Sequence, residues 1–426
     1  MRIFWIAPAV VLLGLGALIL WPAPADRGHG AFFKDVSYNF EAVRVLHDVA
    51  AAGGDSNEAL QAIGAIKAGD ADSWYAAWLT AGDLVFARSQ HINDAQSRGN
   101  ALLRAHTYYR SAEFFLPPQD ARRTDVYRKN VLAFYQGLDA QGVLYERSAI
   151  AYGSHHLNAV YYPGSAGADS RPLLVVVGGY DSTLEELYLS IAAAAHQRGY
   201  AVLTYEGPGQ GAVLREQGLT MQADWEKPNA AVLDAFLSNH AKPRKIVLLG
   251  ESLGGYLAPR AAAFDARIDG VVAYDIWYDG YAVAARHVPS FVFWLHAHGH
   301  DGLLESLARR NPDSGSRWAV ANGQWVFGVH GMFDVLDVFK AYRLAPVAAQ
   351  IKQDVLLLAG TEDHFVPIEQ LELTKKALTA AHSVTAVTFD SASGGSLHGQ
   401  VGAPSLWQGV LFDWMATKFG PVTTAN

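Results

Sequence analysis

The chain has 426 residues, of which half are hydrophobic and 12% aromatic, so it can bury a large core and is not a disordered protein. Lys and Arg number 33 against 41 Asp and Glu, giving a formal net charge of −8 without a long basic run, which argues against a nucleic-acid-binding protein. The absence of cysteine excludes disulfides, thiolate metal sites and a cysteine nucleophile. Chemistry based on serine or on carboxylates is left open.

The first 25 residues have the pattern of an export signal. Arg2 precedes an uncharged apolar stretch over 3–20, and Ala-Pro-Ala over 23–25 matches the small-x-small sequence that signal peptidases accept. The apolar stretch is long for a signal peptide and slightly short for a membrane span. We expect 1–25 to be a cleaved signal peptide or an uncleaved membrane anchor, with the remaining chain periplasmic, extracellular or anchored outside the cytoplasm.

Helical periodicity extends over residues 38–140. Apolar residues recur three or four positions apart in five successive stretches, many of them aromatic. Asp55 and Glu58 begin the second stretch with the spacing of a capping box, and Pro117-Pro118 ends the fourth. This pattern predicts an all-helical domain whose aromatic residues form its core.

After Gly142 the period changes to that of buried strands. Residues 143–152 and 156–162 have the pattern of strands, and short apolar runs follow over 173–177, 201–205, 246–249, 271–274, 355–358 and 384–389. Helical stretches separate most of these runs, as is typical of parallel strands in an α/β sheet. The alternation breaks over about 276–346, where 12 aromatic residues gather. We predict an α/β domain over 143–420, with this insert as a helical cap over the carboxyl edge of the sheet.

The segment from Gly250 to Gly254, Gly-Glu-Ser-Leu-Gly, has the G-x-S-x-G sequence of a nucleophile elbow. It follows the predicted strand over 246–249 and precedes a helical stretch, which is the strand–turn–helix setting that the motif requires. The glycines permit a tight turn that lifts the Ser252 hydroxyl clear of the sheet. The sequence therefore predicts an α/β-hydrolase fold with Ser252 as its nucleophile.

A serine hydroxyl needs a base to take its proton, and in α/β-hydrolases an acid and then a histidine follow the serine. Asp363 comes just after the predicted strand over 355–358, and His398 lies in a Gly- and Ser-rich loop after the last predicted strand. All three residues fall at the carboxyl ends of strands, where they can meet. We predict that Asp363 orients His398 and that His398 is the base.

Three neighbouring residues are rivals for these roles. Glu362 could replace Asp363 as the acid, although the turn over 365–367 directly after Asp363 favours the aspartate. His364 and His382 could replace His398 as the base. His364 adjoins the acid, however, and His382 ends a helical stretch, so both are poorly placed.

The oxyanion of an acyl-transfer intermediate needs two backbone N–H donors. Leu253, directly after the serine, supplies one. Gly178-Gly179-Tyr180-Asp181 follows the predicted strand over 173–177, so the N–H of Tyr180 or Gly179 supplies the other. We expect Asp181 to face the site.

Two further patterns resemble ligand sites. The segment over 207–212 has the G-x-G-x-x-A form of a dinucleotide fingerprint, but it contains a proline and no ribose-binding acid follows it. His296, His298 and His300 alternate in the insert, but no carboxylate pair accompanies them. We therefore expect no cofactor, no metal and no nucleic acid, and only a small-molecule substrate.

Five segments, GGYDSTLEE, YEGPGQG, GESLGG, TEDHFVPIEQ and HGQVG, occur in this order behind the helical region. They resemble the branch of the α/β-hydrolases that contains 2,6-dihydropseudooxynicotine hydrolase and the fungal hydrolases that shorten polyketide pigment precursors. The resemblance extends from about Phe40 to the C-terminus, SWYAAW and YYRSAEFFL included. It implies a serine hydrolase that cleaves a carbon–carbon bond next to a carbonyl, with its site between the helical domain, the cap and the α/β core.

The same resemblance assigns the triad to Ser252, Asp363 and His398. It also places Asp181 where the nicotine-pathway enzyme has a glutamate that contributes to its chemistry, so Asp181 is the candidate acid for protonating a departing carbon. We expect an acyl-enzyme mechanism on a bulky, largely apolar carbonyl compound, with either a β-diketone-like carbon–carbon bond or an ester as the target. An acyltransferase with the same triad is the alternative, and a non-catalytic binding protein on this scaffold is a third.

Overall fold

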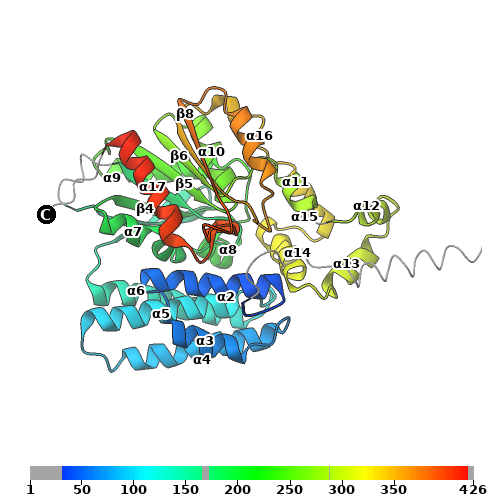
Figure 1. Cartoon of the computed structure of the whole chain (residues 1–426), viewed down its shortest axis with the longest axis horizontal. Coiled ribbons are helices and arrows are strands. Elements are labelled where there is room, and N and C mark those ends of the chain that lie inside the picture. Colours follow the sequence, from blue (N-terminus) through cyan, green and yellow to red (C-terminus); the bar gives the residue numbers. More distant parts are fainter. Residues whose placement is uncertain (1–30, 166–171, 287, 421–426) are drawn as a thin grey trace, which may run out of the picture.

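The computed structural model describes residues 31–165, 172–286 and 288–420, and Figure 1 shows a layer of helices packed against an α/β domain. The expected signal peptide or anchor over 1–25 lies outside the described residues. Among the residues that are described, no helix has both the length and the apolar character needed to cross a membrane.

The N-terminal layer is helical throughout. Its helices are α2 (Val36–Asp48), α3 (Ser56–Ala65), α4 (Ala71–Ser89), α5 (Ala95–Glu113) and α6 (Arg122–Gln141), with a 3-10 turn over Val49–Ala51 after α2. An aspartate side chain accepts backbone N–H groups at the start of each of the first four. These caps satisfy donors that a helix N-terminus otherwise leaves without partners. The acidic residues between the apolar stretches thus fix where the helices begin.

The expected capping box at α3 is only half present. Asp55 accepts from the backbone N–H of Asn57 and Glu58, at 3.0 and 3.5 Å. The carboxylate of Glu58 instead accepts from Arg104 Nε at 2.8 Å and from the Tyr108 hydroxyl at 2.9 Å, both on α5. A charged partner on a neighbouring helix has replaced the local bond that the sequence predicted.

The α/β domain contains an eight-stranded sheet in the order β1-β2-β4-β3-β5-β6-β7-β8, in which β1 and β2 pair antiparallel and the strands from β4 onward run parallel. The strands are β1 (Glu146–Tyr152), β2 (His155–Tyr162), β3 (Leu173–Val177), β4 (Ala201–Glu206), β5 (Ile246–Glu251), β6 (Gly270–Tyr274), β7 (Asp354–Gly360) and β8 (Ser383–Phe389). Every residue of β3 and β6 is buried, as their unbroken apolar sequences require. The predicted α/β-hydrolase fold behind a helical region is confirmed.

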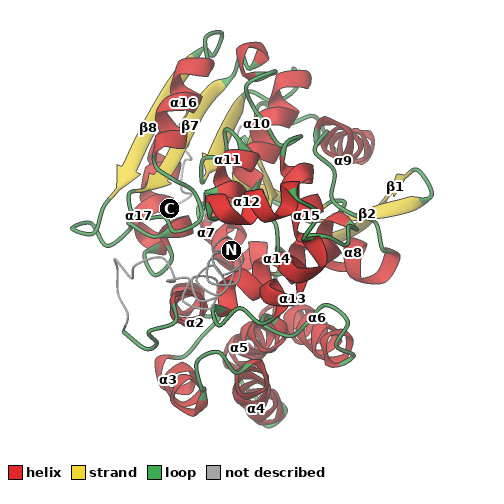
Figure 2. Cartoon of the chain, turned by 90° about the vertical axis from the view of Figure 1, so that its right-hand side faces the viewer, coloured by secondary structure: helices red, strands yellow, loops and turns green. Residues whose placement is uncertain are grey.

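Helices cover the sheet and form the cap. A π-helical turn (Tyr188–Ala192), α7 (Ala193–Gln197), α8 (Gly211–Gln217), α9 (Glu226–Asn239), α10 (Gly254–Phe264), a 3-10 turn (Ala348–Gln350), α16 (Glu369–Ala377) and α17 (Pro404–Phe419) belong to the α/β domain. The insert between β6 and β7 forms α11 (Gly280–Ala285), α12 (Ser290–Ala297), α13 (Asp301–Arg309), α14 (Ser314–Phe327) and α15 (Met332–Phe339). Figures 1 and 2 show these five helices at one end of the molecule, beside both domains.

A buried group of ion pairs, here called the interdomain network, joins the helical domain to the sheet. Arg44 on α2 lies 3.0 Å from both Asp181 and Glu186, and Arg110 on α5 lies 3.2 and 2.8 Å from the same two carboxylates. Glu41 contacts both arginines, at 3.5 and 3.3 Å. Because these charges are largely out of water, each needs its partners. The network therefore fixes the helical domain against the loop after β3.

Replacing Arg110 by methionine should destabilise the fold strongly. Three carboxylates would lose a cation that is only 8% exposed, so we expect the free energy of unfolding to fall by about 3–5 kcal/mol. The control is Lys129→Met, whose pair with Asp83 is nearly half exposed and should contribute no more than about 1 kcal/mol. Denaturant unfolding monitored by circular dichroism measures both, and equal small losses would contradict the role of the network.

Candidate active site

Ser252 occupies the turn between β5 and α10 and has a positive φ of 56°. Few residues other than glycine adopt this left-handed conformation, so the surrounding structure must hold it there. A Cβ atom on Gly250 would lie only 1.9 Å from the carbonyl oxygen of Gly254, and a Cβ on Gly254 would lie 2.9 Å from that of Val177, so both ends of the turn favour glycine. The turn is the predicted elbow, and it places the serine at the carboxyl edge of the sheet.

The structure brings the three predicted residues into one hydrogen-bonded chain. His398, in the 3-10 turn His398–Gln400, has its Nε2 2.9 Å from Ser252 Oγ. Its Nδ1 lies 2.7 Å from Asp363 Oδ2. The other oxygen of Asp363 accepts the backbone N–H groups of Phe365 and Val366, at 2.7 and 2.8 Å, which fixes the orientation of the carboxylate.

The rival residues are not part of this series of hydrogen bonds. Glu362 accepts a hydrogen bond from Ser396 Oγ at 2.9 Å. The side chain of His382 is 77% exposed at the far end of β8. The ring of His364 is 6.4 Å from that of His398, centroid to centroid, and packs edge-on against Phe40. Asp363 and His398, not these rivals, are therefore the side chains hydrogen-bonded in line with Ser252.

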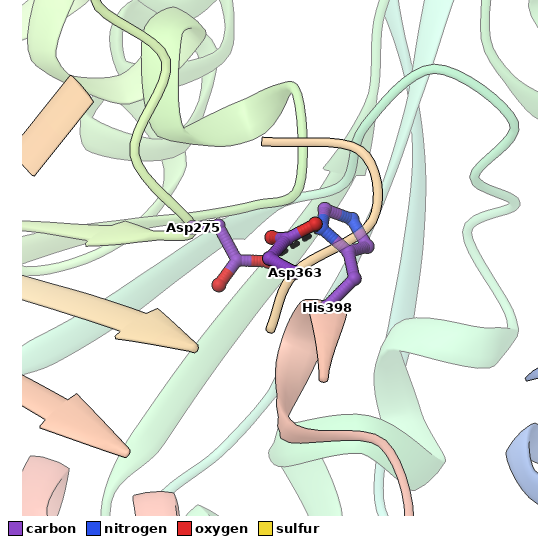
Figure 3. A group of neighbouring side chains, drawn as sticks. All are labelled: Asp275, Asp363 and His398. Atoms are coloured by element: carbon purple, nitrogen blue, oxygen red, sulfur yellow. Dashed lines mark hydrogen bonds and ion pairs between the residues drawn. The ribbon is translucent and has the colours of Figure 1, made fainter. Parts of the chain in front are cut away.

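A second carboxylate, which directly precedes the predicted cap insert, also contacts the histidine. Asp275 directly follows β6, and its Oδ2 lies 2.9 Å from His398 Nδ1 (Figure 3). Its side chain is 1% exposed and accepts the backbone N–H of Gly399 at 2.7 Å. Asp363 was predicted because it is an acid shortly after a buried strand. Asp275 has the same feature, so it could have been predicted from the sequence in the same way.

These charges act on one another strongly. Burial by itself would lower the pKa of His398, but Asp363 and Asp275 more than offset it, so the pKa of the imidazole lies well above its ordinary value. Burial raises the pKa of Asp363, and Asp275 adds to that effect. The three side chains are close enough to share a cation. We interpret them as a hydrogen-bonded relay, because the Nδ1–H is the donor that both carboxylates contact.

Backbone groups suited to an oxyanion lie against the serine. A Cβ on Gly179 would meet Leu253 N and Ser252 Cβ at 2.9 Å each, so the loop after β3 is pressed against the elbow and only glycine fits there. Leu253 begins α10 and is fully buried. Gln210 Nε2 donates to the carbonyl oxygens of Gly178 and Gly179, at 2.7 and 2.9 Å, and so holds this loop in place.

Gln210 comes from the segment over 207–212 that resembles a dinucleotide fingerprint. In the structure this segment holds the loop after β3, and its Ala212 N–H is bonded to Glu206 at 3.0 Å. Of the histidines in the cap, His296 contacts Asp301 at 2.7 Å and His298 contacts the Trp294 carbonyl oxygen at 2.8 Å. Neither pattern needs a ligand to explain it.

The two residues after Gly179 contact different parts of the protein. The hydroxyl of Tyr180 donates to the carbonyl oxygen of Ala319 on α14 at 3.0 Å, which ties the loop to the cap. Asp181 belongs to the interdomain network. Although burial would raise the pKa of Asp181, Arg44 and Arg110 outweigh it and leave the pKa below its ordinary value. Asp181 is therefore held as a carboxylate.

A cavity of about 400 Å³ opens onto the serine and the histidine. Its apolar wall comes mainly from the cap, including Trp277, Val283, Leu304, Trp318 and Phe339. Its polar wall contains the interdomain network together with Asp48 and Glu251. Burial raises the pKa of each of these last two carboxyls to about 7. The cavity thus combines a large apolar surface with a wall of closely spaced acids.

The helical domain also supports the histidine loop. Phe40 on α2 packs against Phe365 and His398, with ring centroids 5.9 and 6.2 Å apart. His47, also on α2, accepts the backbone N–H of Gly402 at 3.2 Å. Burial lowers the pKa of His47 to about 4, so the imidazole is neutral and can accept this bond. These contacts join residues more than 300 positions apart, and no local pattern could have predicted them.

Comparison with known proteins agrees with the fold. The sequence pattern of the Alpha/beta hydrolase family matches residues 173–393. Hydrolase acrC of Aspergillus aculeatus is 31% identical over 427 aligned residues, covering 91% of this chain and 98% of that protein. A 20-hydroxy-prefusarin hydrolase of Gibberella moniliformis is 32% identical, covering 92% and 98%.

The protein therefore belongs to the alpha/beta hydrolase family and is a hydrolase, as the sequence resemblance indicated. Among solved structures, 2,6-dihydroxy-pseudo-oxynicotine hydrolase has the same fold, with a TM-score of 0.69 at 20% identity over 89% of this chain and 95% of that one. The shared fold includes the helical N-terminal region, which the coverage spans.

Proposed function

We propose that this protein is a serine hydrolase that acts through an acyl-enzyme on Ser252. The observation that carries the proposal is the 2.9 Å contact between His398 Nε2 and Ser252 Oγ, with Asp363 holding the opposite ring nitrogen at 2.7 Å. This contact lies at the wall of the cavity, where a substrate carbonyl can reach the hydroxyl. A nucleophile, a base and an orienting acid in hydrogen-bond reach are what nucleophilic catalysis requires.

In the proposed mechanism Ser252 Oγ attacks the substrate carbonyl while His398 Nε2 takes the hydroxyl proton. The N–H of Leu253, together with that of Gly179 or Tyr180, stabilises the oxyanion that forms. The imidazolium then returns its proton to the departing group. Water, activated by the same histidine, releases the acyl group and restores the serine.

The cavity favours a bulky, largely apolar carbonyl compound. Its cap wall is built from aromatic and aliphatic side chains, and its volume of about 400 Å³ is that of a site for small organic molecules. The names of the relatives, a prefusarin hydrolase and a pseudo-oxynicotine hydrolase, agree with a small organic substrate. We propose cleavage of a β-diketone-like carbon–carbon bond or of an ester, with acyl transfer to an alcohol or amine as the alternative outcome of the same intermediate.

The carbon leaving group of a β-diketone must be protonated, and Asp181 was the candidate for this step. Its two arginine contacts, at 3.0 and 3.2 Å, favour the ionised carboxylate, which has no proton to give. We therefore propose that the imidazolium of His398 supplies the proton. Asp181 instead anchors the loop that carries Gly179 and Tyr180.

Export also stays a proposal. It rests on the sequence of residues 1–25 alone, with the catalytic domain placed outside the cytoplasm by a signal peptide or an anchor.

The proposed function predicts that Ser252→Ala abolishes turnover. Protein lacking residues 1–25 would be assayed on p-nitrophenyl esters and on aryl β-diketones, with products identified by mass and with alcohol or amine acceptors added in parallel. We expect a loss of at least about 10³-fold, because the nucleophile is removed.

The control is Ser190→Ala, which removes a second serine of the same cavity whose hydroxyl donates to Glu251 at 2.7 Å. It should retain most of the activity. Diketone cleavage that depends on Ser252 establishes a carbon–carbon hydrolase, and serine-dependent turnover of esters alone establishes a carboxylesterase. Equal activity of Ser252→Ala and wild type would contradict the proposed function.

Asp181→Asn should slow ester and diketone cleavage by similar factors. Asparagine loses the two charged contacts that hold the loop after β3, so the oxyanion donors become less well placed in both reactions. Steady-state kinetics on the two substrates measure the ratio. A loss confined to the diketone would instead show that Asp181 is the acid for the departing carbon.

A further inference from the structure

The proposed mechanism uses one carboxylate behind the histidine, whereas the structure has two. Asp363 follows β7 and Asp275 follows β6, which are neighbouring parallel strands. Their Oδ2 atoms lie 2.7 and 2.9 Å from the same nitrogen, His398 Nδ1 (Figure 3). The geometry thus gives one N–H donor to two acceptors.

We propose that Asp275 is a second acid of the relay, a positioning residue that shares the Nδ1–H of His398 with Asp363 and stabilises the imidazolium when the histidine takes a proton. The inference rests on the proposed function, because it assumes that His398 is the base. It assigns to Asp275 an effect on the reactivity of the histidine that goes beyond holding the loop.

The surroundings of Asp275 support this role. Its side chain is 1% exposed, and apart from His398 its hydrogen-bond donors are Gly399 N at 2.7 Å and Gln400 Nε2 at 3.5 Å, both neutral. A buried carboxylate without a cation is costly. Within the described part of the chain, His398 is the partner in the ion pairs of both Asp275 and Asp363.

The net charge of Asp275, Asp363 and His398 determines whether the neutral imidazole or the imidazolium is favoured. With both carboxylates ionised, the three groups carry two negative charges when the imidazole is neutral and one when it is an imidazolium. Because Coulomb interactions are strong where water is excluded, the second arrangement is more stable, and each carboxylate contributes to holding the proton.

The other side chains that face His398 are a serine hydroxyl and aromatic rings. Ser252 contacts Nε2 from the elbow, Phe40 packs on the ring from α2, and Phe365 packs edge-on from the loop after β7. His364 is 6.4 Å away, centroid to centroid. Tyr274, at the end of β6, bonds through its hydroxyl to the Gly399 carbonyl oxygen. The basicity of His398 is therefore set by Asp363 and Asp275.

The test is the pKa of His398, measured by NMR on histidine-labelled protein lacking residues 1–25 and assigned by comparison with His398→Gln. We expect Asp275→Asn to lower this pKa by at least about one unit, since one of two opposing charges is removed. Asparagine retains an oxygen that can accept the Gly399 N–H. A purely structural role would therefore leave the pKa unchanged, and a change of less than about 0.3 units would overturn the proposal.

The pH dependence of kcat/KM is a second test of the role of Asp275. A base must be unprotonated to act, so wild-type activity should rise with pH through the raised pKa of His398. In Asp275→Asn the midpoint of this rise should move to lower pH, as it should in Asp363→Asn, and the double variant should lose about 10³-fold or more at its optimum. A midpoint that does not move in Asp275→Asn would contradict the shared relay.

The matched control is Asp279→Asn. Asp279 lies four residues further along the same segment, caps α11 and pairs with Arg343, and does not contact His398. Its variant should leave the pKa and the midpoint unchanged. If no variant or wild type shows serine-dependent turnover, the proposed function fails while the NMR pKa still decides the role of Asp275. If turnover depends on Ser252 but the pKa does not respond to Asp275, this inference alone fails.

Discussion

The position of one imidazole governs the site. His398 Nε2 must stay 2.9 Å from Ser252 Oγ, and the loop that carries it has little regular structure of its own. The loop is held by contacts from outside: Asp363 and Asp275 fix the ring through Nδ1, and His47 on α2 accepts the N–H of Gly402. Strand ends of the sheet and a helix of the N-terminal domain thus act together on a single side chain.

The loop after β3, which carries one of the proposed oxyanion donors, is likewise held by contacts from both domains. Gln210 holds the carbonyl oxygens of Gly178 and Gly179 from inside the α/β domain, while Arg44 and Arg110 hold Asp181 from the helical domain. The helical domain therefore holds two loops that border Ser252 and also lines part of the cavity. The α/β core that carries the motifs thus shares its cavity with two other parts of the chain, the cap, which supplies most of the apolar wall, and the preceding helices, which supply part of the polar wall.

The sequence predicted those parts of the site that local patterns encode. Ser252 lies in a motif with a required strand–turn–helix setting, and Asp363 and His398 follow predicted strands in the expected order, so all three could be placed without a structure. The predicted strands coincide with the eight strands of the sheet, and β3 and β6 are apolar throughout because both of their faces are buried.

Contacts between segments that are distant in the sequence could not be predicted from it. In the interdomain network Arg44 and Arg110 contact Asp181 and Glu186 across 71 to 142 positions, and no local pattern marks these partners. Glu58 matched a local capping pattern and bonds to α5 instead. Asp275 is different, because it directly follows the buried strand β6 and could have been predicted as an acid from that position.

The most direct test of the central claim is covalent labelling with a fluorophosphonate, which reacts with a serine only where a neighbouring base activates it. Peptide mapping by mass spectrometry would locate the adduct, with His398→Gln treated in parallel. The account predicts a single adduct on the peptide that contains Ser252 in the wild type and its loss in His398→Gln. Absence of labelling at Ser252 in folded wild-type protein, or equal labelling in His398→Gln, would contradict it.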